Sequence, residues 1–263
     1  MSEENKGYTI KTFPRVRQFY IDTFAVRERK HMVHGLIEVD VTAPRSFIRI
    51  HKSKTGERLS FTAFVIYCLG KAVDANKYMH AYRNWRGQLM LFDEVHVNTM
   101  FEVEVEGKKI PMGRVIRAVN KRTFRELHDE MRAFQSVRQQ DQSMPYERLL
   151  GLYTLIPGFI RRFFFKIALK NPHWINQRVG TVGLTAVGML GEGAGWGITL
   201  PFHTLVITLG GIAEKPAAID GQIEIRELLN VTLSFDHDIV DGGPAARFSQ
   251  HFKELMESGY GLR

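Results

Sequence analysis

The chain has 263 residues, of which 44% are hydrophobic and 24% are charged, and its formal net charge at pH 7 is +8. This length and composition support a single soluble domain over 1–263, with residues 1–13 as an N-terminal tail. The positive charge favours an anionic partner, but no helix-turn-helix, zinc or base-stacking pattern is present. The sequence therefore predicts no nucleic-acid partner, and a phosphorylated small molecule suits the charge equally well.

Two features bear on the cellular location. Cys68 is the only cysteine, so no disulfide can form within the chain, and a reducing cytosol is expected. Its apolar helical surroundings, FTAFVIYCLGKAV, favour a small core residue over a reactive thiol. The N-terminal residues MSEENKGYTIK contain no apolar core, so no signal peptide is predicted. We therefore expect a cytoplasmic protein.

Helical and strand patterns alternate in the first half of the chain, which predicts a mixed α/β domain. In chain order they predict a helix at 15–29, a strand at 36–42 and helices at 44–54 and 60–76. Residues 101–106, FEVEVE, alternate apolar and acidic side chains and predict a half-exposed strand. Thr123 and Glu126 form a capping box that predicts the start of a helix. The apolar stripe of that helix consists of Phe124, Leu127, Met131 and Phe134.

The segment 145–170 combines apolar residues with arginines and lysines, and Pro157 divides it into two predicted helices. Neither half has the roughly 20 apolar residues that cross a bilayer. A basic amphipathic helix can lie on anionic lipid or cover a partner. Packing of the helix on the protein's own sheet explains the same pattern, and we favour it, so contact with a membrane is not predicted.

Strands are predicted at 181–187, 204–209 and 230–235, with a glycine-rich segment at 188–197 between the first two. The spacing of these glycines matches neither a dinucleotide-binding loop nor a P-loop, so a flexible turn is predicted. His31 and His34 lack the spacing of a helical zinc pair, and no cluster of cysteine and histidine completes a site. No metal is expected.

The most informative segment is 234–243, SFDHDIVDGG. An apolar, β-branched and aromatic run predicts a strand before it, and Pro244 with the apolar stripe that follows predicts a helix after it. His237 is therefore expected at a strand end, where a general base can reach a substrate. The alternative is a buried, hydrogen-bonded His237 beside Asp241 as a helix N-cap.

The pattern S-x-D-H-x-x-x-D-G-x-x-A-A-R-F closely resembles the active-site signature of the dihydrolipoamide acyltransferases, the core subunits of 2-oxo-acid dehydrogenase complexes. These share a fold with chloramphenicol acetyltransferase. The segment 180–189, GTVGLTAVGM, resembles the family's T-F-T-I-S-N-L-G-M, with Thr185 in place of an oxyanion-binding serine. Further landmarks resemble the family in the expected order, at 15–17, 37–42 and 110–127. The resemblance extends over residues 14 to 258.

The resemblance implies an α/β fold of the chloramphenicol acetyltransferase type, a mixed-sheet sandwich with helices, assembled as a homotrimer or a multiple of trimers. It implies that His237 removes the proton of a thiol as the thiol attacks a thioester, and that Thr185 stabilises the oxyanion. Asp241 is implied to be structural and turned toward Arg17 or Arg15. The histidine and the hydroxyl are implied to come from neighbouring subunits.

Coenzyme A is implied as the acyl-CoA substrate. The chain shows no lipoyl-lysine motif, so no lipoyl group is expected on it, and the acyl group is expected on a separate lipoyl carrier unless the acceptor is not lipoyl. Three residues depart from the family. Asp238 replaces an arginine and is expected to raise the pKa of His237, Thr185 replaces serine, and Ala186 replaces asparagine.

Two hypotheses of function follow. The first is a free-standing trimeric acyltransferase that uses acyl-CoA or an acyl-dihydrolipoyl carrier. The second is a catalytically weak trimeric scaffold that binds partner proteins or a membrane surface through 145–170. Retention of both His237 and a hydroxyl at Thr185 favours the enzyme, because a scaffold needs neither.

Overall fold

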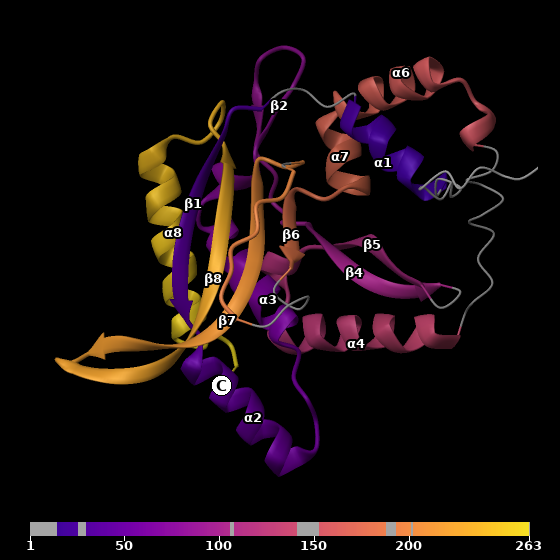
Figure 1. Cartoon of the computed structure of the whole chain (residues 1–263). Coiled ribbons are helices and arrows are strands. Elements are labelled where there is room, and N and C mark those ends of the chain that lie inside the picture. The colour runs from indigo at the N-terminus through magenta and orange to yellow at the C-terminus, as the bar shows by residue number, and fades with distance from the viewer. Residues whose placement is uncertain are drawn as a thin grey trace, which may run out of the picture. The chain divides into compact units, whose positions relative to one another are not determined.

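The computed structural model of the chain describes residues 15–25, 30–105, 108–140, 153–187, 193–200 and 202–262. These residues divide into two compact units (Figure 1). The smaller unit contains helices α1 (Arg15–Ala25) and α6 (Gly158–Leu169), and the larger unit contains all the described strands and the other helices. The predicted tail at 1–13 lies outside the described residues, and the single domain over 1–263 stays a prediction.

The larger unit is built on a six-stranded mixed sheet with the order β1-β8-β7-β6-β4-β5. Its strands are β1 (Met32–Asp40), β4 (Val97–Val105), β5 (Lys108–Ile116), β6 (Val182–Ala186), β7 (Leu205–Ile219) and β8 (Gln222–Asp236). β6 runs parallel to both β4 and β7, and the other pairs are antiparallel. Strands β2 (Tyr82–Arg83) and β3 (Leu89–Met90) form a separate small hairpin.

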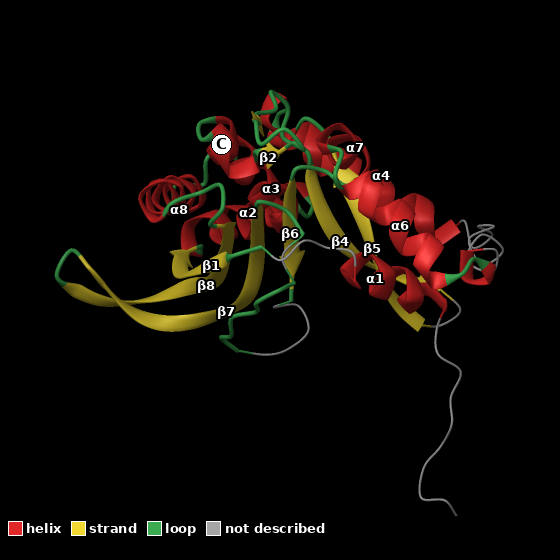
Figure 2. Cartoon of the chain, turned by 90° about the horizontal axis from the view of Figure 1, so that it is seen from above, coloured by secondary structure: helices red, strands yellow, loops and turns green. Residues whose placement is uncertain are grey.

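Helices cover one face of this sheet. They are α2 (Thr42–Thr55), α3 (Phe61–Asp74), α4 (Phe124–Gln140), α7 (Pro172–Arg178) and α8 (Gly242–Glu257), with short 3₁₀ turns η1 (Lys77–His80) and η2 (Val119–Lys121). Figure 2 shows α8, α3 and α2 on the same side of β1 and β8. Phe235 of β8 packs edge-on against Phe248 of α8 at 6.0 Å between ring centroids, and both rings are buried. The mixed α/β prediction is confirmed.

Side-chain caps mark the starts of two helices. The Ser60 hydroxyl accepts a hydrogen bond from Ala63 N at 3.2 Å and caps α3. The capping box is confirmed, because Thr123 N donates to Glu126 Oε2 at 2.7 Å and Glu126 N donates to Thr123 Oγ1 at 3.3 Å. Cys68 is fully buried in α3, as predicted for a core residue.

The predicted strands at 204–209 and 230–235 are too short. β7 and β8 each extend over 15 residues and form a long hairpin that projects from the sheet (Figure 1). Asp220 and Gly221 make its two-residue turn with φ angles of 48° and 81°. An Asp-Gly pair between apolar runs is a strong hairpin signal, and it was overlooked. The sequence patterns also do not predict β5, which contains Pro111, a residue that an edge strand such as β5 tolerates.

Several other predictions fall partly outside the described residues, which exclude 26–29, 141–152 and 188–192. The predicted helix at 15–29 is described as far as Ala25. The side chains of 101–105 are not described, so the acidic face of β4 stays a prediction. Among the described helices, none combines the length and the hydropathy that spanning a membrane requires.

Candidate functional site

His237 lies directly after the last residue of β8, at the strand end that the sequence predicts. Its backbone N–H donates to the carbonyl of His31 at 2.7 Å. The turn is closed by the N–H groups of Ile239 and Val240, which donate to the carbonyl of Asp236 at 3.1 and 2.9 Å. These hydrogen bonds fix the backbone of His237. The imidazole itself is 45% exposed and is therefore accessible to a substrate.

Asp241 occupies the N-cap position of α8, but its side chain caps no helical N–H. It is 86% exposed, and its Oδ1 lies 4.0 Å from Nδ1 of His237. The alternative of a buried His237 beside a capping aspartate is therefore wrong. Arg17 belongs to the smaller unit, and the side chain of Arg15 is outside the described residues, so the predicted pairing of Asp241 with one of them stays a prediction.

A buried ion pair supports the His237 turn. Asp236 is 3% exposed, and its Oδ2 lies 2.5 Å from Nζ of Lys30. Its other oxygen accepts a hydrogen bond from Asp238 N at 3.2 Å. The Lys30 ammonium also lies 5.7 Å from the ring centroid of Tyr82. The D of the D-H motif marks Asp236, but no sequence signal identifies Lys30, which is 206 residues away.

Asp238 contacts a different imidazole from the expected one. Its Oδ1 lies 2.9 Å from Nδ1 of His31, at the start of β1. This hydrogen bond raises the pKa of His31 above its usual value. The Asp238 carboxylate thus forms an exposed pair with His31 beside the turn. The expected influence of Asp238 on His237 stays a prediction.

Replacing Asp238 by asparagine should lower the pKa of His31 toward the ordinary value of about 6.5. Because the folded pKa is raised, the pair stabilises the protein below the ordinary pKa, and this contribution is lost as the pH rises through the raised value. A proton NMR titration of the His31 ring measures the midpoint, with exposed His173 as the internal control. An unchanged His31 midpoint would contradict the pair.

Thr185 lies near the end of β6 and is half-buried. Its neighbours Leu184 and Ala186 pack with the core, so the Thr185 side chain points to the opposite face of the sheet. In the ladder it pairs with Thr208 of β7, which pairs with Thr232 of β8.

One chain does not bring Thr185 and His237 together. Thr232 is the β8 residue level with Thr185, and His237 lies five residues farther along. At about 3.3 Å per residue and about 4.8 Å per strand spacing, the two backbones are about 17 Å apart along the strands and about 10 Å across them. A general base and an oxyanion donor on one substrate need contacts of about 3 Å. A site containing both residues therefore requires a second copy of the chain.

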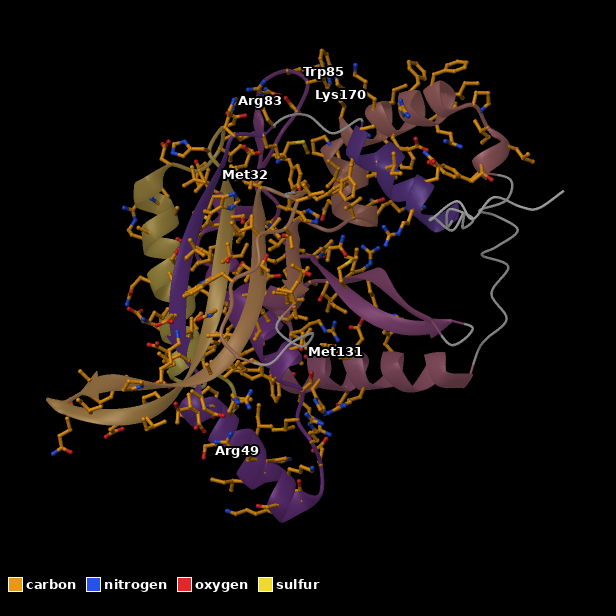
Figure 3. All side chains as sticks on the ribbon, in the orientation of Figure 1. Met32, Arg49, Arg83, Trp85, Met131 and Lys170 are labelled. Atoms are coloured by element: carbon orange, nitrogen blue, oxygen red, sulfur yellow. The ribbon has the colours of Figure 1, made fainter. Side chains whose placement is uncertain are left out.

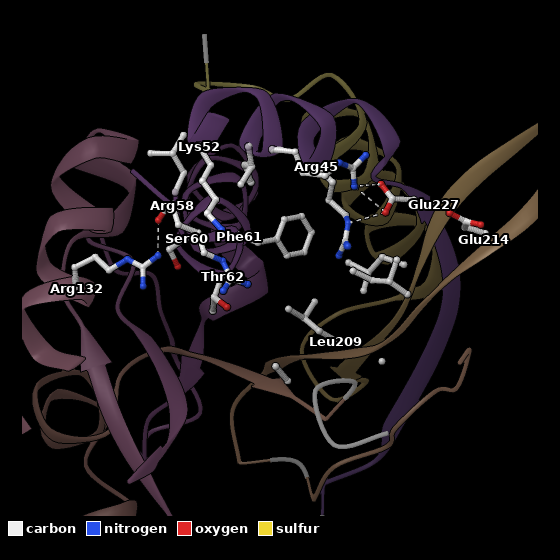
Figure 4. Close-up of a pocket in the computed structure, with 17 residues that line it drawn as sticks. Arg45, Lys52, Arg58, Ser60, Phe61, Thr62, Arg132, Leu209, Glu214 and Glu227 are labelled. Atoms are coloured by element: carbon white, nitrogen blue, oxygen red, sulfur yellow. Dashed lines mark hydrogen bonds and ion pairs between the residues drawn. The ribbon is translucent and has the colours of Figure 1, made fainter. Parts of the chain in front are cut away.

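A pocket of about 890 Å³ opens at the Thr185 end of β6 (Figure 4). Its basic lining comes from α2, the α2–α3 loop and α4, and its apolar lining comes mainly from Phe61 and the sheet. These residues are Arg45, Ile48, Arg49, Lys52, Arg58, Leu59, Ser60, Phe61, Thr62, Arg132, Ala186, Leu209, Gly210, Ile212, Glu214, Glu227 and Leu229. Figure 4 shows the Phe61 ring and Leu209 facing the hollow. Ala186 is the direct neighbour of Thr185.

The pocket carries five cationic side chains and two carboxylates. Glu227 accepts from Arg45 at 3.1 Å and from Arg49 at 3.0 Å; Figure 3 shows Arg49 projecting from α2. Lys52 and Arg58 have no acidic partner within the part of the chain that the structure describes. The N-terminus of α3 also lines the pocket, and it adds a partial positive charge. The pocket can therefore bind an anion with a large apolar portion.

One group of described residues has the ligand spacing of a metal site. Oxygen and nitrogen atoms of Glu57, His128 and Asp129 lie within 4.8 Å of one another. Glu57 is already bound by Arg125 at 2.8 Å, and this bond, with one from His51, lowers its pKa to about 2. The guanidinium occupies the place of a cation, so this group is better described as an ion-pair network.

Residues 175–262 match the model of the 2-oxoacid dehydrogenases acyltransferase family, catalytic domain. The lipoamide acyltransferase component of the branched-chain alpha-keto acid dehydrogenase complex of Pseudomonas putida is 36% identical over 77 residues, which are 29% of this chain and 18% of that protein. The match thus spans about a fifth of the curated relative. The resemblance predicted from the sequence is therefore confirmed over residues 175–262, and its extension over 14–174 stays a prediction.

Solved structures extend the likeness to the whole fold. The dihydrolipoamide acetyltransferase of Azotobacter vinelandii superposes with a TM-score of 0.69 at 15% identity, over 98% of this chain and 96% of that one. Chloramphenicol acetyltransferase superposes with a TM-score of 0.54 at 13% identity, over 93% and 96% of the two chains. The predicted chloramphenicol acetyltransferase-like fold is therefore confirmed.

Proposed function

We propose that the protein is an acyltransferase that moves an acyl group between coenzyme A and a thiol acceptor, dihydrolipoyl or another, with His237 as the general base. The observation that carries the proposal is the exposed His237 at the end of β8, inside the residues that match the family model. The Azotobacter enzyme was studied for the roles of a serine, a histidine and an asparagine in its mechanism. This chain offers Thr185, His237 and Asp241 for comparison.

The chemistry needs no acyl-enzyme. Neutral His237 takes the proton of the thiol while the sulfur attacks the thioester carbonyl. The hydroxyl of Thr185 donates to the oxyanion of the tetrahedral intermediate, which then expels the first thiolate. His237 returns the proton to this leaving sulfur, so the base is restored at the end of each turnover. Asp241, 4.0 Å from Nδ1 of His237, favours the orientation that leaves Nε2 free.

The site forms between subunits of a homotrimer or of a multiple of trimers. The separation of Thr185 and His237 along and across the strands supports this part of the proposal, since two copies are needed to join them. The solved cubic core of a pyruvate dehydrogenase complex has the same fold, with a TM-score of 0.68 at 16% identity.

Coenzyme A fits the basic pocket beside β6. Its phosphates suit Lys52, Arg58 and the N-terminus of α3, and its pantetheine arm suits the apolar lining that leads to Ala186. An acyl group arriving on a separate lipoyl carrier, and a cytoplasmic location consistent with the reduced Cys68, belong to the same proposal.

A screen of acyl-CoA thioesters against free dihydrolipoamide and small amines tests the function. The release of free thiol or of acylated product should be faster than with a His237→Ala control for at least one pair of substrates. If no thioester is consumed faster than with the control variant, the proposed activity is wrong.

Reversal of charge in the pocket should weaken coenzyme A binding. Arg58→Glu and Lys52→Glu should each raise the KM for acyl-CoA by about tenfold, which corresponds to about 1.4 kcal/mol, and should leave kcat nearly unchanged. Lys54→Glu is the matched control, because Lys54 is an exposed lysine of α2 that does not line the pocket. Steady-state kinetics measures both constants. An equal rise in KM for the control would mean that net charge, and not the pocket, binds the substrate.

A further inference from the structure

A buried carboxylate joins the two helices of the smaller unit. Asp22 of α1 is fully buried, and its carboxylate lies 2.8 Å from Nε of Arg161 and 3.3 Å from Nε of Arg162, both on α6. The hydroxyl of Tyr153 donates to the same carboxylate at 2.9 Å. Arg161 itself is buried, so the ion pair determines which face of α6 is turned toward α1.

The opposite face of α6 is apolar and exposed. Phe159, Phe163 and Ile167 follow one another at four-residue spacing and are 75%, 60% and 55% exposed, and Phe164 beside them is 66% exposed. At 100° per residue, this row lies on the side of the helix away from Arg161. Eight of the large hydrophobic side chains that are exposed in the described residues belong to this small unit. Among the described residues of the smaller unit, none covers this face, and packing of 145–170 on the protein's own sheet stays a prediction.

A row of cations runs beside the phenylalanines. Arg162 and Lys166 are exposed and one helical turn apart. Lys166 has no acidic partner in the described ranges. Aromatic side chains bordered by cations are typical of helices that lie in the interface of an anionic membrane.

We propose that the outer face of α6 binds an anionic lipid surface, with the helix parallel to the membrane plane. The 12 residues of α6 are too few to cross a bilayer, which excludes a spanning helix at this place. The phenylalanines enter the boundary between headgroups and acyl chains, and Arg162 and Lys166 contact the lipid phosphates. This attachment is independent of the acyl-transfer site proposed on the larger unit.

Vesicle flotation tests the proposal. The full chain should float with vesicles of phosphatidylcholine containing about a third of phosphatidylglycerol, and much less with pure phosphatidylcholine. Phe159→Ser/Phe163→Ser should lower the partition coefficient about 100-fold, or about tenfold for each ring lost. A tenfold change corresponds to about 1.4 kcal/mol, which is near the lower limit of the free energy gained by burying a phenylalanine side chain. Lys166→Glu should lower binding to the anionic vesicles about fivefold. Trp85→Ser is the control, because Trp85 is an aromatic residue of the larger unit, 79% exposed beside Arg86 (Figure 3).

The possible outcomes distinguish binding of this face to lipid from its contact with a second copy of the chain. Flotation that depends on the phenylalanines and on anionic lipid, but not on Trp85, supports the proposal. No flotation of the unaltered chain at low salt overturns it. If the double variant changes the mass measured by light scattering and leaves flotation unchanged, a second copy of the chain covers the face and the proposal is wrong. Acyl transfer to soluble substrates should be unaffected by the variants, so failure here is distinct from failure of the proposed enzyme.

Discussion

Replacement of His237 by alanine should lower turnover by about 10²- to 10⁴-fold, the usual contribution of a positioned general base. The reason is local. The imidazole is 45% exposed after β8, and Asp241 Oδ1 at 4.0 Å from Nδ1 is the acidic partner that the described residues give it. Truncation of the His237 imidazole to alanine therefore breaks no buried interaction. Thermal unfolding and the mass of the assembly should stay unchanged while kcat falls.

The control for this variant is His173→Ala, at an exposed histidine of α7 outside the turn. It should retain full activity. A His237→Ala protein with undiminished turnover would remove His237 from the mechanism. Loss of activity together with a large fall in melting temperature would instead give His237 a structural role, which its exposure does not predict.

Residues close together in the sequence made the His237 turn predictable. The strand before it, the proline in the first turn of α8 and the D-H-x-x-x-D-G spacing are all local patterns, and they correctly placed His237 at a strand end. Capping chemistry was equally local, so the starts of α3 and α4 were also predictable.

Local sequence patterns do not predict contacts between distant segments. Lys30 and His31 meet Asp236 and Asp238 across more than 200 residues, and neither contact leaves a periodicity or a motif. The basic pocket is assembled from α2, α4 and the sheet, so its charge is visible only after folding. In α6, the sequence showed the amphipathic pattern but could not show that Asp22 draws the arginine face inward.

Mixing two inactive variants should restore activity. Neither His237→Ala nor Thr185→Ala alone contains a complete site, but a mixed trimer can join the intact Thr185 of one chain to the intact His237 of its neighbour. With equal amounts and random assembly, about one site in four is complete, so about a quarter of the unaltered activity should return. The physical reason is the separation of about 17 Å along the strands, which no side chain of a single subunit spans.

The experiment requires reversible dissociation, so the variants are mixed in mild denaturant, refolded together and compared with each variant refolded alone. Light scattering should give about three times the 30.2 kDa chain mass, or a multiple of that trimer. A mixture as inactive as its components, in trimers shown to contain both chains, would mean that Thr185 and His237 do not share a site. A fully active monomer would overturn the subunit boundary itself, because one chain would then have to bring together two residues that the register of β6, β7 and β8 holds apart.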